Sequence, residues 1–195
     1  MTQEIEFAPD VHGTINAARS RGIPWRDVLG ELIDNAFDAG ATMVHITIDG
    51  KELSVEDNGR GCGDFAKMLT MGRHAPHETT KLGRYGVGFK DAAWWVGGPT
   101  TIRTIHKGRV RTLRVDWDHL TGWRLPDPGD EPSDGSIGTR ITFGRTIRRF
   151  PDGKAFSDLR DQIGYIYSPA LKDGRQIGIR RGRSAIELAQ ASSDA

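Results

Sequence analysis

The stretch WRDVLGELIDNAFDAGATMVHITIDGKELSVEDNG, residues 25–59, predicts a helix followed directly by a two-stranded hairpin. Pro24 precedes the helix, and the fixed backbone angle of proline suits a first helical turn, while Gly40 suits the end of the helix. Beyond Gly40, apolar and polar residues alternate, which is typical of strands with one buried face. Asp49 and Gly50 supply a tight turn between the two strands. A helix beside antiparallel strands is therefore the predicted basic unit of the fold.

Further elements are predicted on both sides of this unit. They are a helix over residues 10–19, a short helix over 65–69, a helix over 88–95, strands over 100–108 and 109–117, a strand over 138–143, a helix over 155–167 and a strand over 176–180. Strands and helices are mixed without a regular strand-helix-strand rhythm. We therefore predict an α+β fold: a two-layer α/β sandwich in which a mixed, mostly antiparallel sheet carries helices on one face.

Length and composition indicate a single globular domain. The 195 residues suffice for one hydrophobic core. We therefore predict a single domain over residues 1–183, followed by a polar C-terminal tail at 184–195. No apolar run approaches the roughly 20 residues that a membrane-spanning helix needs. The single cysteine, Cys62, and an N-terminus without a signal-peptide pattern make the cytoplasm the expected compartment.

The charge balance gives little indication of a polyanionic partner. The formal net charge is +1, so there is no overall attraction to nucleic acid. Two basic strings, RTIRR at 145–149 and RRGR at 180–183, could contact nucleic acid, but in a balanced chain we interpret them as solvated edges. We interpret Trp94 and Trp95, which follow the last glycine-rich run in an apolar helix, as core packing and not as a partner contact.

The helix within residues 25–41 has one acidic face. At 3.6 residues per turn, its polar residues fall within about 100° of one another: Glu31, Asp34, Asn35 and Asp38. The apolar residues lie on the other side: Leu29, Leu32, Ile33, Ala36 and Phe37. The acidic face of an amphipathic helix is usually just solvated. The motifs that follow favour a functional role instead.

Asp57 stands where the second strand ends, within the run DNGRG at 57–61. A carboxylate there can accept a hydrogen bond from an exocyclic amine, a charge-assisted bond that contributes about 1.5–3 kcal/mol. Gly59 and Gly61 would let the main chain lie flat against a planar ring. The same run is also typical of an ordinary turn, so by itself it leaves both interpretations open.

A third feature is the glycine-rich run KLGRYGVGFK, residues 81–90, which opens a helix. Amides at a helix N-terminus and the helix dipole together make a site suited to phosphates. The run does not match a Walker A loop, which ends in Gly-Lys-Ser/Thr, and no strand precedes it as in a dinucleotide-binding fingerprint. A phosphate-binding loop of another kind is therefore indicated.

In this order, ELIDNAFDAGA, DNGRG, GRYGVGF and GTRITF resemble the four nucleotide motifs of the GHKL, or Bergerat-fold, superfamily. This superfamily groups gyrase-type topoisomerases, the large heat-shock chaperones, sensor histidine kinases and mismatch-repair ATPases. The motifs span residues 31–143, so the resemblance covers the chain apart from its two ends. It implies an ATP-binding domain that uses magnesium.

The resemblance also implies roles for individual residues. Glu31 would be the general base that activates the attacking water, and Asn35 would coordinate Mg²⁺ through its carbonyl oxygen, a hard ligand of the kind this ion prefers. Asp57 would accept from the adenine amino group, and Thr139 would share a water with it. The other ATP-binding residues would surround the base and the phosphates: Gly59, Gly61, Lys81, Gly83, Gly86, Val87 and Gly88.

Residues 66–85 resemble the ATP lid of the superfamily, a segment that would close over bound nucleotide. The segment includes His74 and His77, which lack the cysteine or acidic partners of a zinc site. We therefore interpret both histidines as lid surface.

The function that the resemblance implies is slow ATP hydrolysis coupled to a conformational change. A kinase catalytic domain of the histidine-kinase type is the nearest enzyme alternative, although DVHGTIN around His12 does not resemble a phosphoacceptor helix. A nucleotide-gated interaction module without useful turnover is the other alternative, because ATPases of the superfamily commonly receive a phosphate-contacting lysine from a second domain. Retention of Glu31 as a general base favours hydrolysis. The implied partners are ATP, an unidentified protein and a second copy of the chain in an ATP-dependent homodimer.

Overall fold

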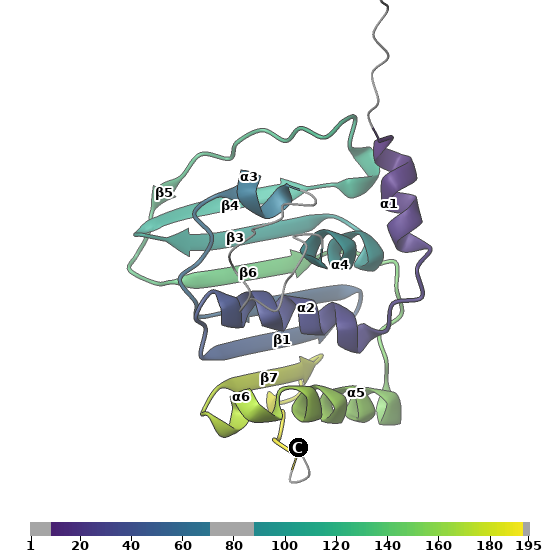
Figure 1. Ribbon diagram of the computed structural model, residues 1–195, viewed down its shortest axis with the longest axis vertical. Helices are drawn as coiled ribbons and strands as arrows, with labels where there is room; N and C mark the ends of the chain where they lie inside the picture. The colour runs from purple at the N-terminus through teal and green to yellow at the C-terminus, as the bar shows by residue number, and fades with distance from the viewer. Residues whose placement is uncertain (1–8, 71–87, 193–195) are drawn as a thin grey trace, which may run out of the picture.

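The computed structural model describes residues 9–70 and 88–192. Within them, eight strands form one sheet in the order β5-β4-β3-β6-β2-β1-β7-β8 (Figure 1). The strands are β1 (Met43–Asp49), β2 (Glu52–Asp57), β3 (Thr100–His106), β4 (Arg109–Val115), β5 (Glu131–Pro132), β6 (Gly138–Phe143), β7 (Gln176–Arg181) and β8 (Glu187–Leu188). β1 and β7 run parallel, and all other neighbouring strands run antiparallel. The sheet is thus mixed and mostly antiparallel, as predicted.

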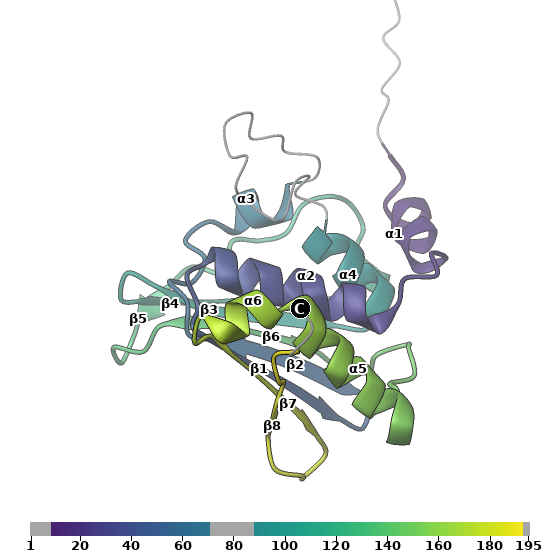
Figure 2. The same cartoon turned by 60° about the horizontal axis from the view of Figure 1, so that its bottom comes forward.

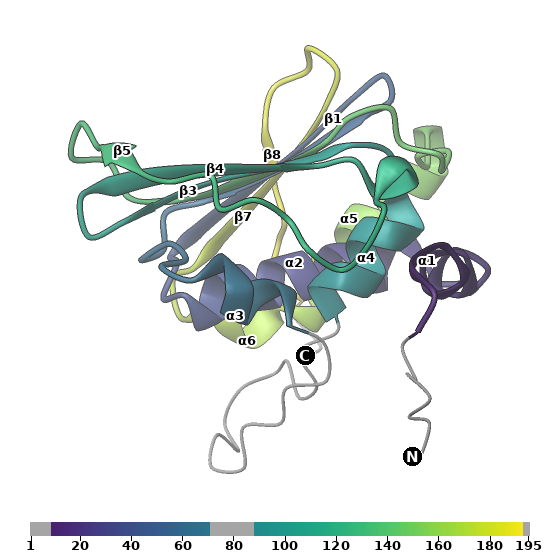
Figure 3. The same ribbon diagram turned by 90° about the horizontal axis from the view of Figure 1, so that it is seen from above.

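Helices cover one face of this sheet (Figure 3). They are α2 (Trp25–Asp38), α3 (Phe65–Leu69), α4 (Gly88–Val96), α5 (Gly153–Ile166) and α6 (Ser168–Lys172). To the side of the sheet, α1 (Val11–Arg19) packs against α4, and a 3-10 turn, η1, lies at Trp117–His119. Within the described residues, no helix is long and apolar enough to cross a membrane. The arrangement confirms the predicted two-layer α+β architecture with helices on one face of the sheet.

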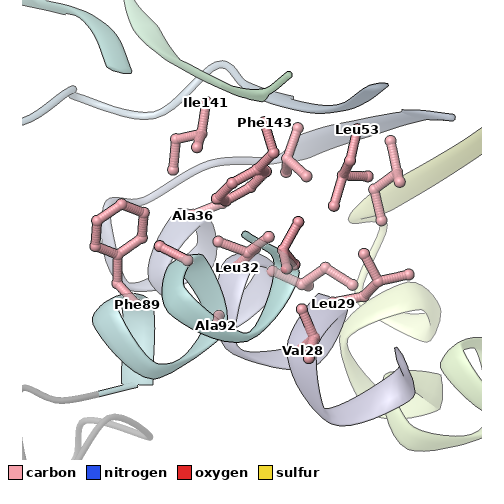
Figure 4. Close-up of a cluster of buried hydrophobic side chains, with 14 of the residues drawn as sticks. Val28, Leu29, Leu32, Ala36, Leu53, Phe89, Ala92, Ile141 and Phe143 are labelled. Atoms are coloured by element: carbon pink, nitrogen blue, oxygen red, sulfur yellow. The ribbon is translucent and has the colours of Figure 1, made fainter. Parts of the chain in front are cut away.

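The core lies between α2 and α4 on one side and the central strands on the other (Figure 4). Leu29 and Leu32 of α2 are at most 2% exposed, and Phe143 of β6 is fully buried. Burying a side chain of this size contributes about 1.5–3 kcal/mol, so these contacts hold α2 against the sheet. Because the apolar face of α2 is used in this way, its polar residues lie on the side away from the strands.

The second hairpin turns where the sequence predicts, and the first turns one residue later than predicted, at Gly50 and Lys51, because Asp49 still pairs with Glu52. Gly50 has a φ of +57° between β1 and β2, and the Lys107-Gly108 pair has φ values of +49° and +73° between β3 and β4. Both turns need the left-handed backbone region, which glycine enters without steric cost. Tight turns fix the register of the hairpins, and this register determines which side chains lie opposite each other at the site.

Four short elements are not predicted from the sequence: η1, β5, α6 and β8. Each has between two and five residues, too few for a helical or strand period to show. β8 corrects the description of residues 184–195 as a tail, because it pairs with β7, and Ala189 beside it is only 6% exposed. Figure 2 shows this segment returning along β7.

Candidate functional site

Glu31 and Asn35 lie one turn apart on α2, and their side chains are hydrogen bonded. The amide Nδ2 of Asn35 donates to Oε1 of Glu31 over 3.1 Å. This bond uses the amide nitrogen and leaves the carbonyl oxygen of Asn35, an exposed residue, for another partner. The pair therefore offers a carboxylate and a neutral hard oxygen side by side.

The N-terminus of α4 abuts this pair. Gly88 begins α4, and a Cβ placed on it would lie 2.0 Å from Cδ of Glu31 and 2.1 Å from Oε2. Only a residue without a side chain lets the helix end approach the carboxylate so closely. A helix N-terminus carries partial positive charge and amide donors that the helix itself leaves unused. The acidic helix and the start of the glycine-rich helix are thus joined at Glu31.

Lys90, one residue beyond Phe89 on α4, brings a positive charge toward Glu31. Its side chain is buried, with 3% exposed, and its Nζ donates to the carbonyl oxygen of Met68 over 3.0 Å. Burial lowers the pKa of Lys90, and the negative charge of Glu31 opposes that shift. Lys90 therefore connects the last turn of α3 to the carboxylate on α2.

The pKa of Glu31 is raised, chiefly by burial. The hydrogen bond from Asn35 and the charge of Lys90 oppose this rise, whereas the negative charges of Asp34 and Asp38 add to it. A carboxylate with a raised pKa takes up a proton more readily than an ordinary surface glutamate does. The surroundings of Glu31 thus suit a general base.

Asp57 lies at the end of β2, directly opposite Thr139 on β6. Its Oδ1 accepts a hydrogen bond of 2.8 Å from the amide of Gly59. Burial raises the pKa of the Asp57 carboxyl, and hydrogen bonding from the backbone of Gly59 and Thr139 opposes this rise. A half-buried carboxylate beside a hydroxyl offers an acceptor and a donor in one place.

The glycines after Asp57 allow close packing of the main chain on both sides. Gly61 has a φ of +70°, and a Cβ on it would lie 2.1 Å from the carbonyl oxygen of Ile105 on β3. A Cβ on Gly59 would lie 3.0 Å from the carbonyl oxygen of Ala39, which accepts from the amide of Arg60 over 3.0 Å. Since Ala39 caps the C-terminal end of α2, the loop connects the sheet to the helix that carries Glu31.

Two polar residues of the motifs have structural partners. The side-chain oxygen of Asn58 accepts from the amides of Thr42 and Met43, over 2.9 and 3.0 Å, and thereby fixes the start of β1. The hydroxyl of Tyr167, which caps α5, donates to Oδ1 of Asp34 over 2.7 Å. The acidic face of α2 is therefore divided between Glu31 and Asn35, which bond to each other, and Asp34, which anchors α5.

The predicted site residues within the described part of the chain form two groups. Glu31, Asn35 and Gly88 gather where α2 meets α4, and the second group gathers at one end of the strands: Asp57, Gly59, Gly61 and Thr139. Lys81, Gly83, Gly86 and Val87 lie outside the described residues, as do His74 and His77. Of the predicted lid at 66–85, the structure describes residues 66–70.

Three residues beside these groups are not among those predicted from the sequence: Lys90, Thr104 and His106. The hydroxyl of Thr104 accepts from the amide of Cys62 over 2.7 Å, and Nδ1 of His106 lies 2.8 Å from the carbonyl oxygen of Arg60. Period-two alternation in TTIRTIHKG puts Thr104 and His106 on one face of β3, but it does not reveal what that face contacts.

The tryptophan pair and one basic string take part in packing. Trp94 and Trp95 are 4% and 7% exposed, which confirms the interpretation as core residues. The guanidinium of Arg148 lies 4.7 Å from the ring centre of Trp95 and donates to the carbonyl oxygen of that residue over 3.0 Å. The interpretation of RTIRR as a solvated edge is therefore wrong for Arg148, because its planar cation stacks on an indole.

The described part of the structure includes two hollows of appreciable volume. One, of about 690 Å³, is lined by Arg26 of α2 and by residues of α5, among them Tyr165. The other, of about 540 Å³, lies between α3, α4 and the segment after η1, and Lys90 and Trp94 line it. Of the predicted site residues that the structure describes, none lines either hollow, so the candidate site rests on the contacts above.

Sequence comparison identifies a family for most of this region. The family described as "Histidine kinase-, DNA gyrase B-, and HSP90-like ATPase" matches residues 24–136, more than half of the chain. The match begins at the cap of α2 and ends just before β6. It therefore includes Glu31, Asn35 and Asp57, whereas Thr139 follows it.

Individual relatives come from bacteria and animals. The DNA mismatch repair protein MutL of Deinococcus radiodurans is 30% identical over 155 residues, which cover 69% of this chain and 27% of that protein. ATPase morc-1 of Caenorhabditis elegans is 32% identical over 93 residues, covering 45% and 11% of the two chains. ATPase MORC2B of Mus musculus is 38% identical over 96 residues, covering 44% and 9%. The chain thus spans about a quarter or less of the length of these relatives.

Proposed function

The chain belongs to the histidine kinase-, DNA gyrase B- and HSP90-like ATPases, and from this premise we propose that it binds ATP with Mg²⁺ and hydrolyses the ATP slowly. Family membership supports ATP binding and ATPase activity in general. The observation that supports hydrolysis in this chain is the contact between the start of α4 and the Glu31 carboxylate at Gly88. It brings together a base and the anion-binding end of a helix.

The adenine end of the nucleotide is assigned to the strand ends. Asp57 would accept from the exocyclic amine, with Thr139 beside it and Gly61 against the ring. The Asp57 carboxylate is pre-organised because one of its oxygens is held by the amide of Gly59. A nucleobase with a hydrogen-bond acceptor in place of the exocyclic amine would face the Asp57 carboxylate, which is also an acceptor, and would bind poorly.

The metal-bound phosphates are assigned to α2 and α4. Asn35 fits an oxygen ligand of Mg²⁺ because its nitrogen is committed to Glu31, which leaves the carbonyl oxygen for the ion. Mg²⁺ bound there would neutralise phosphate charge and polarise the terminal phosphoryl group. The amides at the start of α4 would face phosphate oxygens, and the predicted loop residues Lys81, Gly83, Gly86 and Val87 would add to this cradle.

In the proposed hydrolysis, Glu31 accepts a proton from the water that attacks the terminal phosphorus. The bond from the water oxygen to phosphorus forms as the bond between phosphorus and the bridging oxygen breaks. The raised pKa of Glu31, caused chiefly by burial, favours proton uptake, and the charge of Lys90 partly opposes this rise. Phosphate then leaves, and Glu31 returns its proton to solvent.

We also place a conformational response in this function. Lys90 on α4 is bonded to Met68 in α3, the helix with which the described part of the predicted lid begins. A change in the position of α3 would therefore change the surroundings of Glu31. In this proposal ATP binding and release alter the α3 position, and a partner protein or a second copy of the chain responds to it.

Labelled ATP tests the proposal and separates it from its alternatives. The purified chain with Mg²⁺ and [γ-³²P]ATP is expected to release labelled phosphate. Label retained on a protein side chain would instead indicate a kinase. Saturable ATP binding by calorimetry without phosphate release, with and without candidate partners, would indicate a nucleotide-gated module. Absence of ATP binding would overturn the assignment altogether.

A further inference from the structure

Thr104 extends the pair of Asp57 and Thr139 by one strand. Asp57 on β2 lies opposite Thr139 on β6, and Thr139 lies opposite Thr104 on β3, so the three side chains form a row across the sheet on its helix-covered face. Thr104 is fully buried. A buried hydroxyl must find its hydrogen-bond partners within the protein, so the partners of Thr104 determine where it donates and where it accepts.

The direction follows from the partners of Thr104. The amide of Cys62 can only donate, so over 2.7 Å the Thr104 oxygen accepts. The remaining contact in the described part of the chain is Oγ1 of Thr139, 3.1 Å away. If Thr139 donated to Thr104, the proton of Thr104 would have no acceptor, an arrangement that costs more than a satisfied bond. Thr104 therefore donates to Thr139, and the proton of Thr139 points elsewhere.

We propose that Thr104 is a positioning residue that fixes Thr139 as a hydrogen-bond donor toward the purine, and so contributes to selection of adenine. This inference rests on the proposed ATP function. Adenine presents an amine donor to Asp57 and an acceptor at N1. In the proposed site, a water between Asp57 and N1 would donate its two protons to them and could then only accept from Thr139. Guanine presents an acceptor and a donor in the opposite order and does not match this arrangement.

The proposal predicts a dependence on the N1 atom in the unmodified protein. 1-Deaza-ATP keeps the amine and the triphosphate but has a C–H group in place of N1. The wild-type chain with Mg²⁺ is expected to bind ATP about tenfold more tightly than 1-deaza-ATP, the effect of one hydrogen bond. Calorimetry or competition with a fluorescent nucleotide measures the two affinities. Equal affinities would overturn the proposal without requiring any variant to fold.

Variants at position 104 then test the positioning role. Thr104→Val removes the hydroxyl at nearly constant shape and is expected to reduce the preference for ATP over 1-deaza-ATP at least threefold, because Thr139 loses its anchor. Thr104→Ser keeps the hydroxyl and is expected to keep the preference. Thr101→Val, at a position on the opposite face of β3, is the matched control. A purely structural role for Thr104 would weaken both nucleotides equally and leave their ratio unchanged.

The outcomes separate this inference from the proposed function. If the wild-type chain binds neither ATP nor 1-deaza-ATP, the ATP assignment itself fails. If it binds ATP through Asp57 but Thr104→Val retains the full wild-type preference, only the role of Thr104 is refuted.

Discussion

Gly88 and Glu31 are in direct contact across α4 and α2, because a Cβ on Gly88 would lie 2.0 Å from Cδ of Glu31. In Gly88→Ala, we expect the flexible Glu31 side chain to move while the helices stay in place. Turnover should then fall by roughly 10²–10⁴-fold, the usual contribution of a general base. Steady-state phosphate release and thermal unfolding measure the two effects, and the unfolding temperature should change little.

Gly22→Ala is the matched control for this variant. An added Cβ at Gly22 has no atom within 4 Å, and both activity and stability should be close to wild type. Full turnover in Gly88→Ala would show that the observed Glu31 position is not required for catalysis.

Asp57→Asn is expected to weaken ATP binding by at least tenfold, because a charge-assisted bond to the adenine amine contributes about 1.5–3 kcal/mol. The substitution spares the fold, since the asparagine oxygen can still accept from the amide of Gly59. Isothermal titration with Mg-ATP measures the affinity. Asp49→Asn, at the exposed hairpin end of β1, serves as the control. The adenine assignment fails if the two variants bind ATP equally well.

Glu31→Ala should separate binding from chemistry. Nucleotide affinity is expected to stay within a few-fold of wild type, because Asp57, Asn35 and the start of α4 remain. Phosphate release should fall by roughly 10²–10⁴-fold, since the proposed general base is missing and this is its usual contribution. Glu52→Ala, on an exposed position of β2, should retain turnover. Undiminished hydrolysis in Glu31→Ala would remove this residue from the mechanism.

Much of the fold follows from local patterns in the sequence. The apolar stripe of α2 and the alternation around Ile46 predict their elements because the buried face of each repeats at a fixed period. Glycine at turns such as Gly50 marks the hairpins. β8 could not be predicted from the sequence, because two residues show no period and the strand forms only by pairing with β7.

Only those residues of the candidate site that belong to a recognisable sequence motif could be predicted. Glu31 and Asp57 occur in recognisable runs, but Thr104 is an ordinary strand residue until the register of β3 and β6 sets it beside Thr139. Lys90 belongs to GVGFK, yet its bond to Met68 depends on how α3 packs on α4. Pairings between distant segments are set by packing, and a single sequence does not display them.

Asp34 gives a prediction about stability and pH. Burial raises the pKa of its carboxyl, and the hydrogen bond from Tyr167 opposes this rise. The unfolded chain loses the Asp34 proton near the ordinary pKa of 3.8, while the folded chain keeps it to higher pH. As pH rises through this window, the folded state binds more protons than the unfolded state, so stability falls.

The variant Asp34→Asn lacks this loss of stability, and the oxygen of the asparagine side chain can still accept from Tyr167. The free energy of unfolding of Asp34→Asn, measured by urea denaturation, should therefore increase relative to that of wild type as pH rises from 4 toward 7. Tyr167→Phe removes the opposing bond and should do the reverse, losing stability relative to wild type over the same range. If the difference in free energy of unfolding between Asp34→Asn and wild type stays constant with pH, burial does not raise the pKa of Asp34.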